Sequence, residues 1–383
     1  MLSIALRMLF GDPVKLVGLI AGIAFSTLLM AQQGGFFVGL ISRSANGVSA
    51  IPLVDVWVMD PRTETAESPV QLRPADLYRV RGVEGVTSAV ALTQTTVTLR
   101  AGPGRSSIAT LFGLDDATLT GAPTDFVVGG LADLRRPEAL SIDLLTFERL
   151  WPGLAAALGP EGAGALATFE INDRRAVVTA VADVLPGFGA PGVVHARASN
   201  AALWAPDARP AYILVRAAGD PAQVAARIEA ATGLKALPAR SFARETIDYV
   251  IGNTGIAFSF GVVIGLGAIV GILVSGLTFT LFVNDNIRQF AVLKAVGVSN
   301  LRLVGMVSAQ AMTVAFLGYS FGLWGAAGFF EGVNQPLSDL KGFYLPWQIA
   351  VGVAGATVAI VLLATLISLR RVLRLDPATI FRG

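Results

Sequence analysis

The stretch that decides the fold of this chain is NDNIRQFAVLKAVGVS, residues 284–299. It lies between two long apolar segments, 253–283 and 304–330, each of which is long enough to cross a bilayer. Asp285 and Asn286 are residue types that begin helices, and Gly297 is the type that ends them. The sequence therefore predicts a short helix held between two membrane-spanning helices.

One face of this predicted helix is mostly apolar. Ile287, Phe290, Ala291 and Lys294 recur at helical spacing, so we expect the helix to lie along the membrane surface. A helix placed in this way is either a solvated connector or a handle on which another protein can push. Spacing alone leaves both interpretations open.

The amino-acid sequence of this segment resembles that of a known protein family. The run IRQFAVLKAVGVS, residues 287–299, resembles the "REIGVLRALGAS" loop of the FtsX-like/MacB-type permeases of ABC transporters. The run LRRVLRLDPA, residues 369–378, is similar to that family's "ARRAARLDPAEALR" tail. In the family the loop is the coupling helix that docks into the ATPase subunit, which implies these coupling residues here: Ile287, Arg288, Phe290, Leu293, Lys294 and Gly297.

One departure from the family pattern lies within that loop. Gln289 and Phe290 stand where the family usually has a Glu-Ile pair, so a salt bridge through that glutamate is not implied here.

Composition places much of the chain in lipid. Of its 383 residues 54% are hydrophobic and only 15% are charged, and the mean hydropathy is +0.65. In soluble domains about a quarter of all residues are charged. The net charge of +2 is too small to argue for nucleic acid as a partner.

The chain offers little to a catalytic or cofactor site. It has no cysteine and a single histidine, His195, which we expect on a surface loop. No G-x-x-x-x-G-K-[ST] run is present, so ATP and Mg²⁺ are expected on a separate ATPase chain. We therefore expect a subunit that is not itself an enzyme and that holds no cofactor.

Four apolar segments predict four spans. The first, 14–41, is nearly twice as long as the core of a cleavable signal peptide, the competing interpretation. The predicted fold is an α-helical membrane protein of four transmembrane helices with an inserted extracytoplasmic α/β (porter-like) domain. Its expected parts are 1–42 (N-terminal segment and span 1), 43–250 (periplasmic α/β domain), 251–283 (span 2), 284–303 (cytoplasmic loop with the coupling helix), 304–330 (span 3), 331–346 (short periplasmic loop), 347–369 (span 4) and 370–383 (cytoplasmic tail).

Basic residues set the orientation. They precede the first span, lie around the 284–303 loop and follow the fourth span, whereas the 331–346 loop has a single lysine, Lys341. The positive-inside rule then places both termini and the 284–303 loop in the cytoplasm. We expect a multi-pass protein of the bacterial inner membrane.

Within the inserted domain, alternation in 54–59 and the Thr/Val-rich run 86–99 predict strands. The order strand 212–216, helix 221–232, strand 234–237 predicts that early and late pieces share one sheet, similar to the porter-like domain of the MacB family. We expect a helix over 141–150, and another over 241–250 that runs directly into the second span.

Two motifs suggest enzymes but lack the required context. GYSFG, residues 318–322, matches the G-x-S-x-G pattern of a nucleophile elbow but lies inside a predicted membrane helix. Its glycines are better explained by helix packing. GFGAPG, residues 187–192, spells a dinucleotide fingerprint without a following helix. We expect that loop to be flexible, or else a contact for a periplasmic partner through Phe188.

Other glycines predict a dimer seam along the first two spans. Gly35 and Gly39, and Gly261 and Gly265, are spaced four apart, which permits close helix approach.

The resemblance implies a permease that forms a dimer with a second copy and binds two copies of an ATPase. The first span and residues 78–86 are similar to the DevC-like branch, where a periplasmic membrane-fusion adaptor and an outer-membrane channel export a glycolipid or similar amphiphile. The alternatives are an FtsX-like signalling scaffold that regulates cell-wall hydrolases, Lol-type lipoprotein extraction, and a membrane-embedded enzyme.

Overall fold

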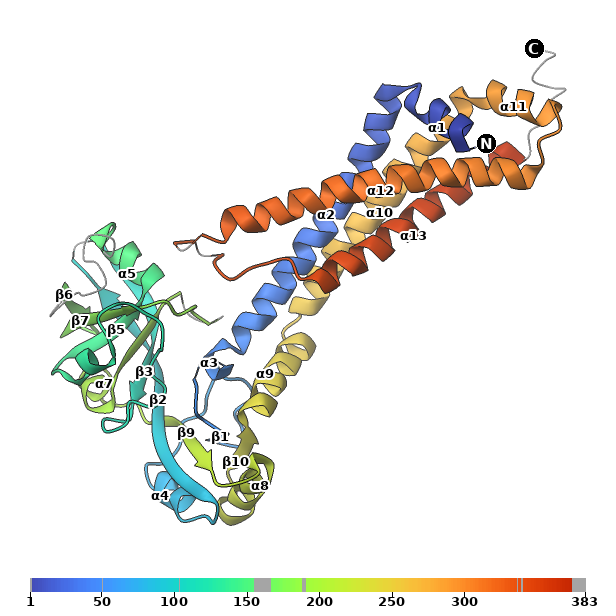
Figure 1. The fold of residues 1–383 in the computed structure, drawn as a ribbon. Helices are drawn as coiled ribbons and strands as arrows, with labels where there is room; N and C mark the ends of the chain where they lie inside the picture. Colours follow the sequence, from blue (N-terminus) through green and yellow to red (C-terminus); the bar gives the residue numbers. More distant parts are fainter. Residues whose placement is uncertain are drawn as a thin grey trace. The chain divides into compact units, whose positions relative to one another are not determined.

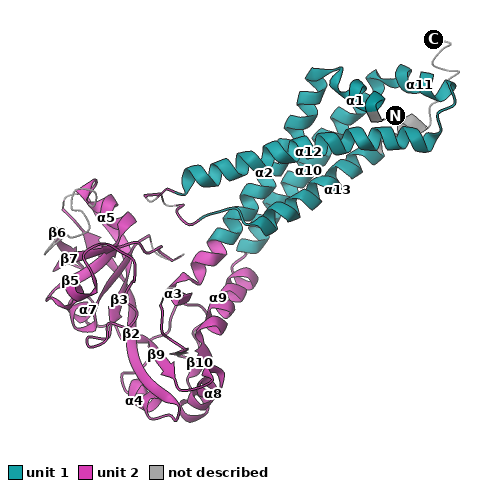
Figure 2. Ribbon diagram, in the orientation of Figure 1, with its two compact units in different colours: residues 1–39, 256–334, 343–383 teal, residues 40–255, 335–342 magenta. Residues whose placement is uncertain are grey.

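The computed structural model describes residues 2–49, 51–102, 104–154, 167–187, 191–335, 337–338 and 340–373. They divide into two compact units, coloured teal and magenta in Figure 2. The helical unit comprises Met1–Gly39, Ile256–Asn334 and Phe343–Gly383, and the α/β unit comprises Leu40–Gly255 and Gln335–Gly342.

The helical unit is built from helices that are apolar over most of their length. They are α1 (Leu2–Phe10), α2 (Pro13–Ser44), α10 (Ile256–Asp285), α11 (Ile287–Ala295), α12 (Asn300–Val333) and α13 (Trp347–Leu373) (Figure 1). Four are long and apolar enough to cross a membrane: α2, α10, α12 and residues Trp347–Leu366 of α13. The start of α2 follows from local chemistry, because the Asp12 carboxylate accepts from the Lys15 backbone N–H and Pro13 occupies the first helical position.

Small residues bring α12 against α2, as the spacing of Gly318 and Gly322 predicts. A Cβ added at Gly318 would lie 2.6 Å from the Cβ of Ile23, and one added at Gly322 would lie 2.7 Å from the Cβ of Thr27. The glycines therefore permit close backbone approach, and the GYSFG run lies within a helix rather than at a strand–helix turn.

Hydroxyl groups add interhelical hydrogen bonds. The Ser26 hydroxyl donates to the Gly267 carbonyl at 2.7 Å, the hydroxyls of Thr27 and Thr357 lie 3.1 Å apart, and the Tyr319 hydroxyl donates to the Ala350 carbonyl at 3.1 Å. Such bonds satisfy polar groups that lipid cannot.

The α/β unit contains one ten-stranded sheet with the order β10-β1-β9-β2-β3-β8-β5-β7-β4, in which β6 pairs with β2 and β7. The strands are β1 (Val56–Met59), β2 (Val86–Arg100), β3 (Ser106–Leu114), β4 (Phe126–Val128), β5 (Ala139–Asp143), β6 (Ala167–Ile171), β7 (Arg174–Ala182), β8 (Val193–Arg197), β9 (Pro210–Ala217) and β10 (Lys235–Pro238). The early strand β1 pairs with the late strands β9 and β10, so the predicted sharing of one sheet is confirmed.

The long strand β2 joins two halves of this sheet (Figure 1). Its first half pairs with β9 and its second half with β3. The pairings β2–β3–β8–β5–β7–β6–β2 close a ring of six strands. Inside the ring lies a core that includes Phe147, Phe169 and Trp204, while a second core around β1 and β9 holds Trp57, Tyr212 and Phe242.

The helices of the α/β unit cover these cores. They are α3 (Asn46–Ser49), α4 (Asp76–Arg81), the short 3₁₀ helix η1 (Leu131–Arg135), α5 (Leu144–Leu150), α7 (Ala198–Trp204), α8 (Pro221–Thr232) and α9 (Ala239–Asn253). The predicted helix over 141–150 is wrong in its first residues, which belong to β5. The buried Asp143 ends that strand and accepts from the backbone N–H of Thr146, so the helix begins only after it.

Two further expectations are corrected. The helix α9 does not run directly into α10. Thr254 and Gly255 interrupt the helical conformation between them, and Gly255 adopts a φ of +71°. His195 does not lie on a surface loop. It is in β8 and is only 7% exposed, and its ring stacks on Phe112.

Candidate functional site

The helix α11 occupies residues Ile287–Ala295, within the stretch that the sequence singles out. Its end is set by Gly297, which adopts a φ of +93°. The Gly297 N–H donates to the Lys294 carbonyl at 3.1 Å and the Val298 N–H donates to the Leu293 carbonyl at 3.0 Å. These two bonds form a Schellman motif, so the predicted C-terminal stop at Gly297 is confirmed.

The start of α11 differs from the expectation. Asn286 makes no side-chain cap, and its Nδ2 instead donates to the Phe282 carbonyl at 2.9 Å, at the end of α10. The Asp285 carboxylate pairs with the Lys15 ammonium at 2.6 Å, near the start of α2. Asp285 therefore joins the end of α10 to the start of α2, and Asn286 joins the start of α11 to α10.

One face of α11 is fixed in a hydrophobic core. Phe290 and Ala291 are fully buried. Phe290 belongs to a cluster with residues of α1, α10 and α12, among them Leu9, Phe279 and Leu303. Leu293 packs against the same cluster. Burying a phenylalanine side chain stabilises by about 1.5–3 kcal/mol, so this face anchors the helix firmly.

The opposite face is open. Arg288 and Gly297 are exposed, Val292 is 48% exposed and Val296 is 81% exposed. Leu301, in the first turn of α12, is also 81% exposed. Arg288, Val292 and Val296 follow one another at i, i+4 spacing and so share a side of the helix. We call Arg288, Val292, Val296 and Leu301 the open face of α11.

The structure thus divides the predicted coupling residues. Arg288 and Gly297 are accessible, Ile287, Leu293 and Lys294 are half-buried, and Phe290 is inaccessible. The Phe290 side chain packs within this chain and is not itself accessible to a partner, and its part in coupling stays a prediction. Val292 and Val296 were missed, although their spacing from Arg288 could have indicated them.

The predicted dimer glycines also separate. Gly35 meets the Phe330 ring, and a Cβ added at Gly39 would lie 2.9 Å from Cε1 of Phe343, so both glycines are covered within the same chain. That packing corrects the expectation for these two positions. A Cβ added at Gly261 or Gly265 would meet nothing within 4 Å.

The predicted partner-contact residue Phe188 lies outside the described residues. The described part of its loop does continue into strand β8 rather than into a helix, so no helix N-terminus is available for a phosphate. In the described ranges no group of three His, Cys, Asp or Glu side chains could hold a metal ion.

Comparison with known proteins concerns the two units separately. Residues 261–377 match the family model described as FtsX-like permease C-terminal, a range that includes α11. No curated protein matches the chain.

The solved structures similar to this chain include extracytoplasmic domains of two transporters. One is the extracellular domain of the noncanonic ABC-type transporter YknZ from Gram-positive bacteria, at 15% identity and a TM-score of 0.33, covering 48% of this chain and 98% of that one. Another is the periplasmic region of MacB from Actinobacillus actinomycetemcomitans, at 14% identity and a TM-score of 0.37, covering 52% and 95%.

Four candidate spans, an inserted α/β domain and a short anchored helix between the second and third spans define the architecture of a polytopic membrane protein. By the family match, residues 261–377 form an FtsX-like permease C-terminal domain.

Proposed function

We propose that this chain is the permease subunit of an ABC exporter and transmits the motion of a separate ATPase to its own α/β domain. The observation that carries the proposal is α11, which is fixed on one face by Phe290 and open on the other. A contact on the open face can move the helix only together with the cluster that holds it, because closely packed cores transmit displacement. The ATPase is expected in two copies and brings ATP and Mg²⁺.

The open face has the composition of a protein contact. Val292, Val296 and Leu301 expose apolar surface beside the guanidinium of Arg288. Clustered exposed apolar side chains next to a charged group are typical of a docking surface.

The α/β unit is tied to the spans at more than its two ends. The segment Gln335–Gly342, between α12 and α13, packs as part of the α/β unit. Arg43 donates through Nη2 to the Lys341 carbonyl at 2.5 Å, and the Lys341 ammonium pairs with Asp183 at 2.5 Å. Movements of α12 and α13 can therefore reach the α/β unit through this segment as well as through α2 and α10.

The placement of basic residues supports cytoplasmic termini and a cytoplasmic α11, with the α/β domain outside the inner membrane. For the second permease copy, α10 offers Gly261 and Gly265 with open space around them. We propose that a homodimer contact uses this part of α10 and not Gly35 or Gly39.

The cargo we propose is a lipid or another amphiphile, passed to a periplasmic adaptor and an outer-membrane channel as in the DevC-like branch. The alternatives are an FtsX-like scaffold that regulates cell-wall hydrolases, and Lol-type lipoprotein extraction. They differ in the partner outside the membrane, so co-purified proteins separate them.

The test is affinity purification of the tagged full chain from native membranes, with identification of its partners by mass spectrometry. We expect an ABC ATPase and a periplasmic adaptor. The variants Val292→Asp and Arg288→Glu should lose the ATPase. Leu53→Asp replaces an exposed apolar side chain of the α/β unit in the same way and should retain the ATPase.

Recovery of a cell-wall hydrolase in place of the adaptor favours the scaffold. Recovery of no ATPase by the unmodified chain, or full recovery by both α11 variants, contradicts the proposed coupling.

A further inference from the structure

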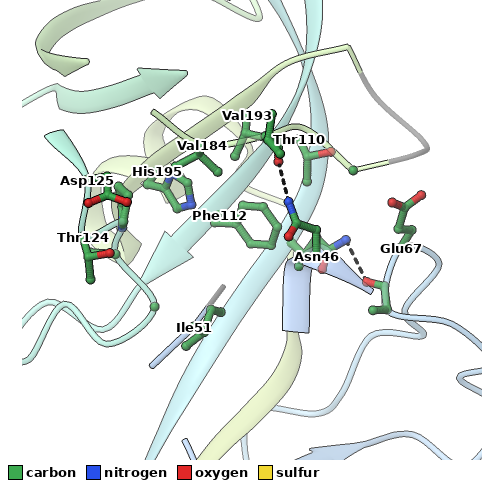
Figure 3. Close-up of a pocket in the computed structure, with 18 of the residues that line it drawn as sticks. Asn46, Ile51, Glu67, Thr110, Phe112, Thr124, Asp125, Val184, Val193 and His195 are labelled. Atoms are coloured by element: carbon green, nitrogen blue, oxygen red, sulfur yellow. Dashed lines mark hydrogen bonds between the residues drawn. The ribbon is translucent and has the colours of Figure 1, made fainter. Parts of the chain in front are cut away.

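A pocket of about 360 Å³ lies within the α/β unit (Figure 3). Its walls come from segments far apart in the chain, including Asn46 of α3, Gln94 of β2, Phe112 of β3 and His195 of β8. We propose that this pocket binds a small amphiphilic amine, with the apolar group against Phe112 and the ammonium on the side of His195 and Asp125. This proposal is independent of the coupling role of α11.

The position of His195 is the first argument. Its neighbours in β8, Val194 and Ala196, point into the core of the six-stranded ring, so His195 points to the ring's outside, where the pocket lies. The imidazole stacks on Phe112 with ring centroids 5.3 Å apart and an interplanar angle of 15°. Within the described part of the chain no hydrogen bond joins its ring nitrogens to another residue.

His195 is more than nine-tenths buried, and the part of its ring that stays accessible lines the pocket, where a ligand can form a hydrogen bond to it. Burial lowers the pKa of His195 to about 4, so the ring is neutral at pH 7. A neutral imidazole keeps one nitrogen that can accept a hydrogen bond, which suits an ammonium donor.

The charges of the pocket are the second argument. Glu67, Asp125 and Asp183 line it, and none of the lining residues is Arg or Lys. The nearby Lys341 ammonium is held by Asp183. The acidic side chains of the lining outnumber the basic ones even when Lys341 is counted, which disfavours an anionic ligand and favours a cation.

The apolar walls are the third argument. Ile51, Phe112, Val184, Leu185 and Val193 give the pocket an apolar portion, and its volume falls within the range of sites for small molecules. The rim is preformed, since Asn46 Nδ2 donates to the Leu185 carbonyl at 3.3 Å and Gln94 Nε2 donates to the Ala66 carbonyl at 3.2 Å (Figure 3). An amphiphile matches both portions, whereas a bare inorganic cation leaves the apolar wall unused.

The experiment uses the fact that the chain contains one histidine. The full chain, purified through a tag without histidine and labelled with [¹³C]histidine, is placed in lipid nanodiscs. The single His195 Cε1–H NMR signal then reports the pocket alone. Three probes of equal shape are titrated: 4-phenylbutylamine, 4-phenylbutanol and 4-phenylbutanoate.

We expect 4-phenylbutylamine to shift the His195 signal saturably, the alcohol to bind at least about tenfold more weakly, and the carboxylate to cause no shift. Thr96→Trp, at an exposed wall position, should abolish the shift by filling the pocket. Asp125→Asn should weaken amine binding by up to about tenfold, and Glu67→Gln should weaken it less, because Glu67 lies on the other side of the pocket. Asp207→Asn, an exposed carboxylate outside the pocket, is the matched control and should change nothing.

Equal response to the amine and the carboxylate overturns the proposal, as does the absence of any shift. A shift that persists in Thr96→Trp also overturns it, because it reflects partition into the nanodisc lipid. Using two separate charge variants keeps the test valid if one of them fails to fold.

Discussion

The two units of this permease use the same kinds of apolar side chain in opposite ways. The helical unit leaves Phe258 and Trp324 each 77% exposed, whereas the α/β unit buries Trp57 and Trp204 to 2% exposure. Apolar surface that faces lipid gains nothing from further burial, so helices in a membrane associate through close fit and hydrogen bonds. The α/β unit is held mainly by removal of apolar area from water.

The helix α11 combines the two. The face that carries Phe290 packs into a core of large apolar side chains, as in the α/β unit. That core, however, lies among the ends of the spanning helices. The comparison therefore predicts that a different change lowers stability in each region. At α11 it is truncation of a core side chain, between the spans it is a larger side chain, and in the α/β unit it is protonation.

The largest effect is expected from Phe290→Ala. Removing this fully buried ring should lower the free energy of unfolding by about 4 kcal/mol, since it leaves a cavity as well as losing contact area. SDS-titrated unfolding of the purified chain measures it. Val292→Ala, on the open face of the same helix, should cost less than about 0.5 kcal/mol. Similar losses for both variants are incompatible with the anchored face.

The next effect concerns the contact of α12 with α2. Gly322→Ile should destabilise by about 2–3 kcal/mol, because its Cβ and methyl groups collide with Thr27 and the Ala24 backbone. Gly328→Ile is the matched control, since a Cβ at Gly328 would meet nothing within 4 Å. The same unfolding assay compares the two. If Gly322→Ile is tolerated as well as Gly328→Ile, close helix approach does not hold these spans.

A smaller effect is expected from acid in the α/β unit. The pKa of His195 is about 4 in the folded chain, below the ordinary 6.5, so below pH 6.5 the unfolded state binds more protons. Its contribution to stability is present above pH 6.5 and is lost as pH falls towards 4. Between pH 7 and pH 5 the loss is about 2 kcal/mol.

An NMR titration of the single histidine measures this directly. The midpoint should lie near pH 4 in the folded chain and near 6.5 in denaturant. His195→Leu should remove the corresponding part of the acid sensitivity. A folded-state midpoint above 6 would show that Glu67, Asp125 and Asp183, which line the same pocket, outweigh burial.

The smallest effect is expected at the segment between α12 and α13. The ion pair of Lys341 and Asp183 is partly exposed, so a double-mutant cycle with Lys341→Met and Asp183→Asn should give a coupling energy of about 0.5 kcal/mol. Its loss should affect coupled ATP hydrolysis more than stability, if this segment transmits motion. Unchanged coupling would leave α2 and α10 as the transmitting helices.

Periodicity and composition were sufficient for much of the fold. The four spans, the helix ending at Gly297, the packing role of Gly318 and Gly322 and the sharing of a sheet by β1, β9 and β10 depend on local chemistry or on strong repeating patterns. The break at Gly255 and the start of α5 after Asp143 were missed, because a single glycine or a capping aspartate within an apolar or helical run has several possible outcomes.

The sequence by itself determined that this chain spans a membrane, that it carries an α/β insertion and that a short helix lies between two spans, because hydropathy and helix caps act within a few residues of chain. Only the tertiary structure decided which face of α11 is open, since the partners of Phe290 come from α1, α10 and α12. It also decided that Gly35 and Gly39 are covered while a Cβ at Gly261 or Gly265 would meet nothing within 4 Å, and that His195 lines a pocket. Burial depends on which distant segments meet, and no local pattern contains that information.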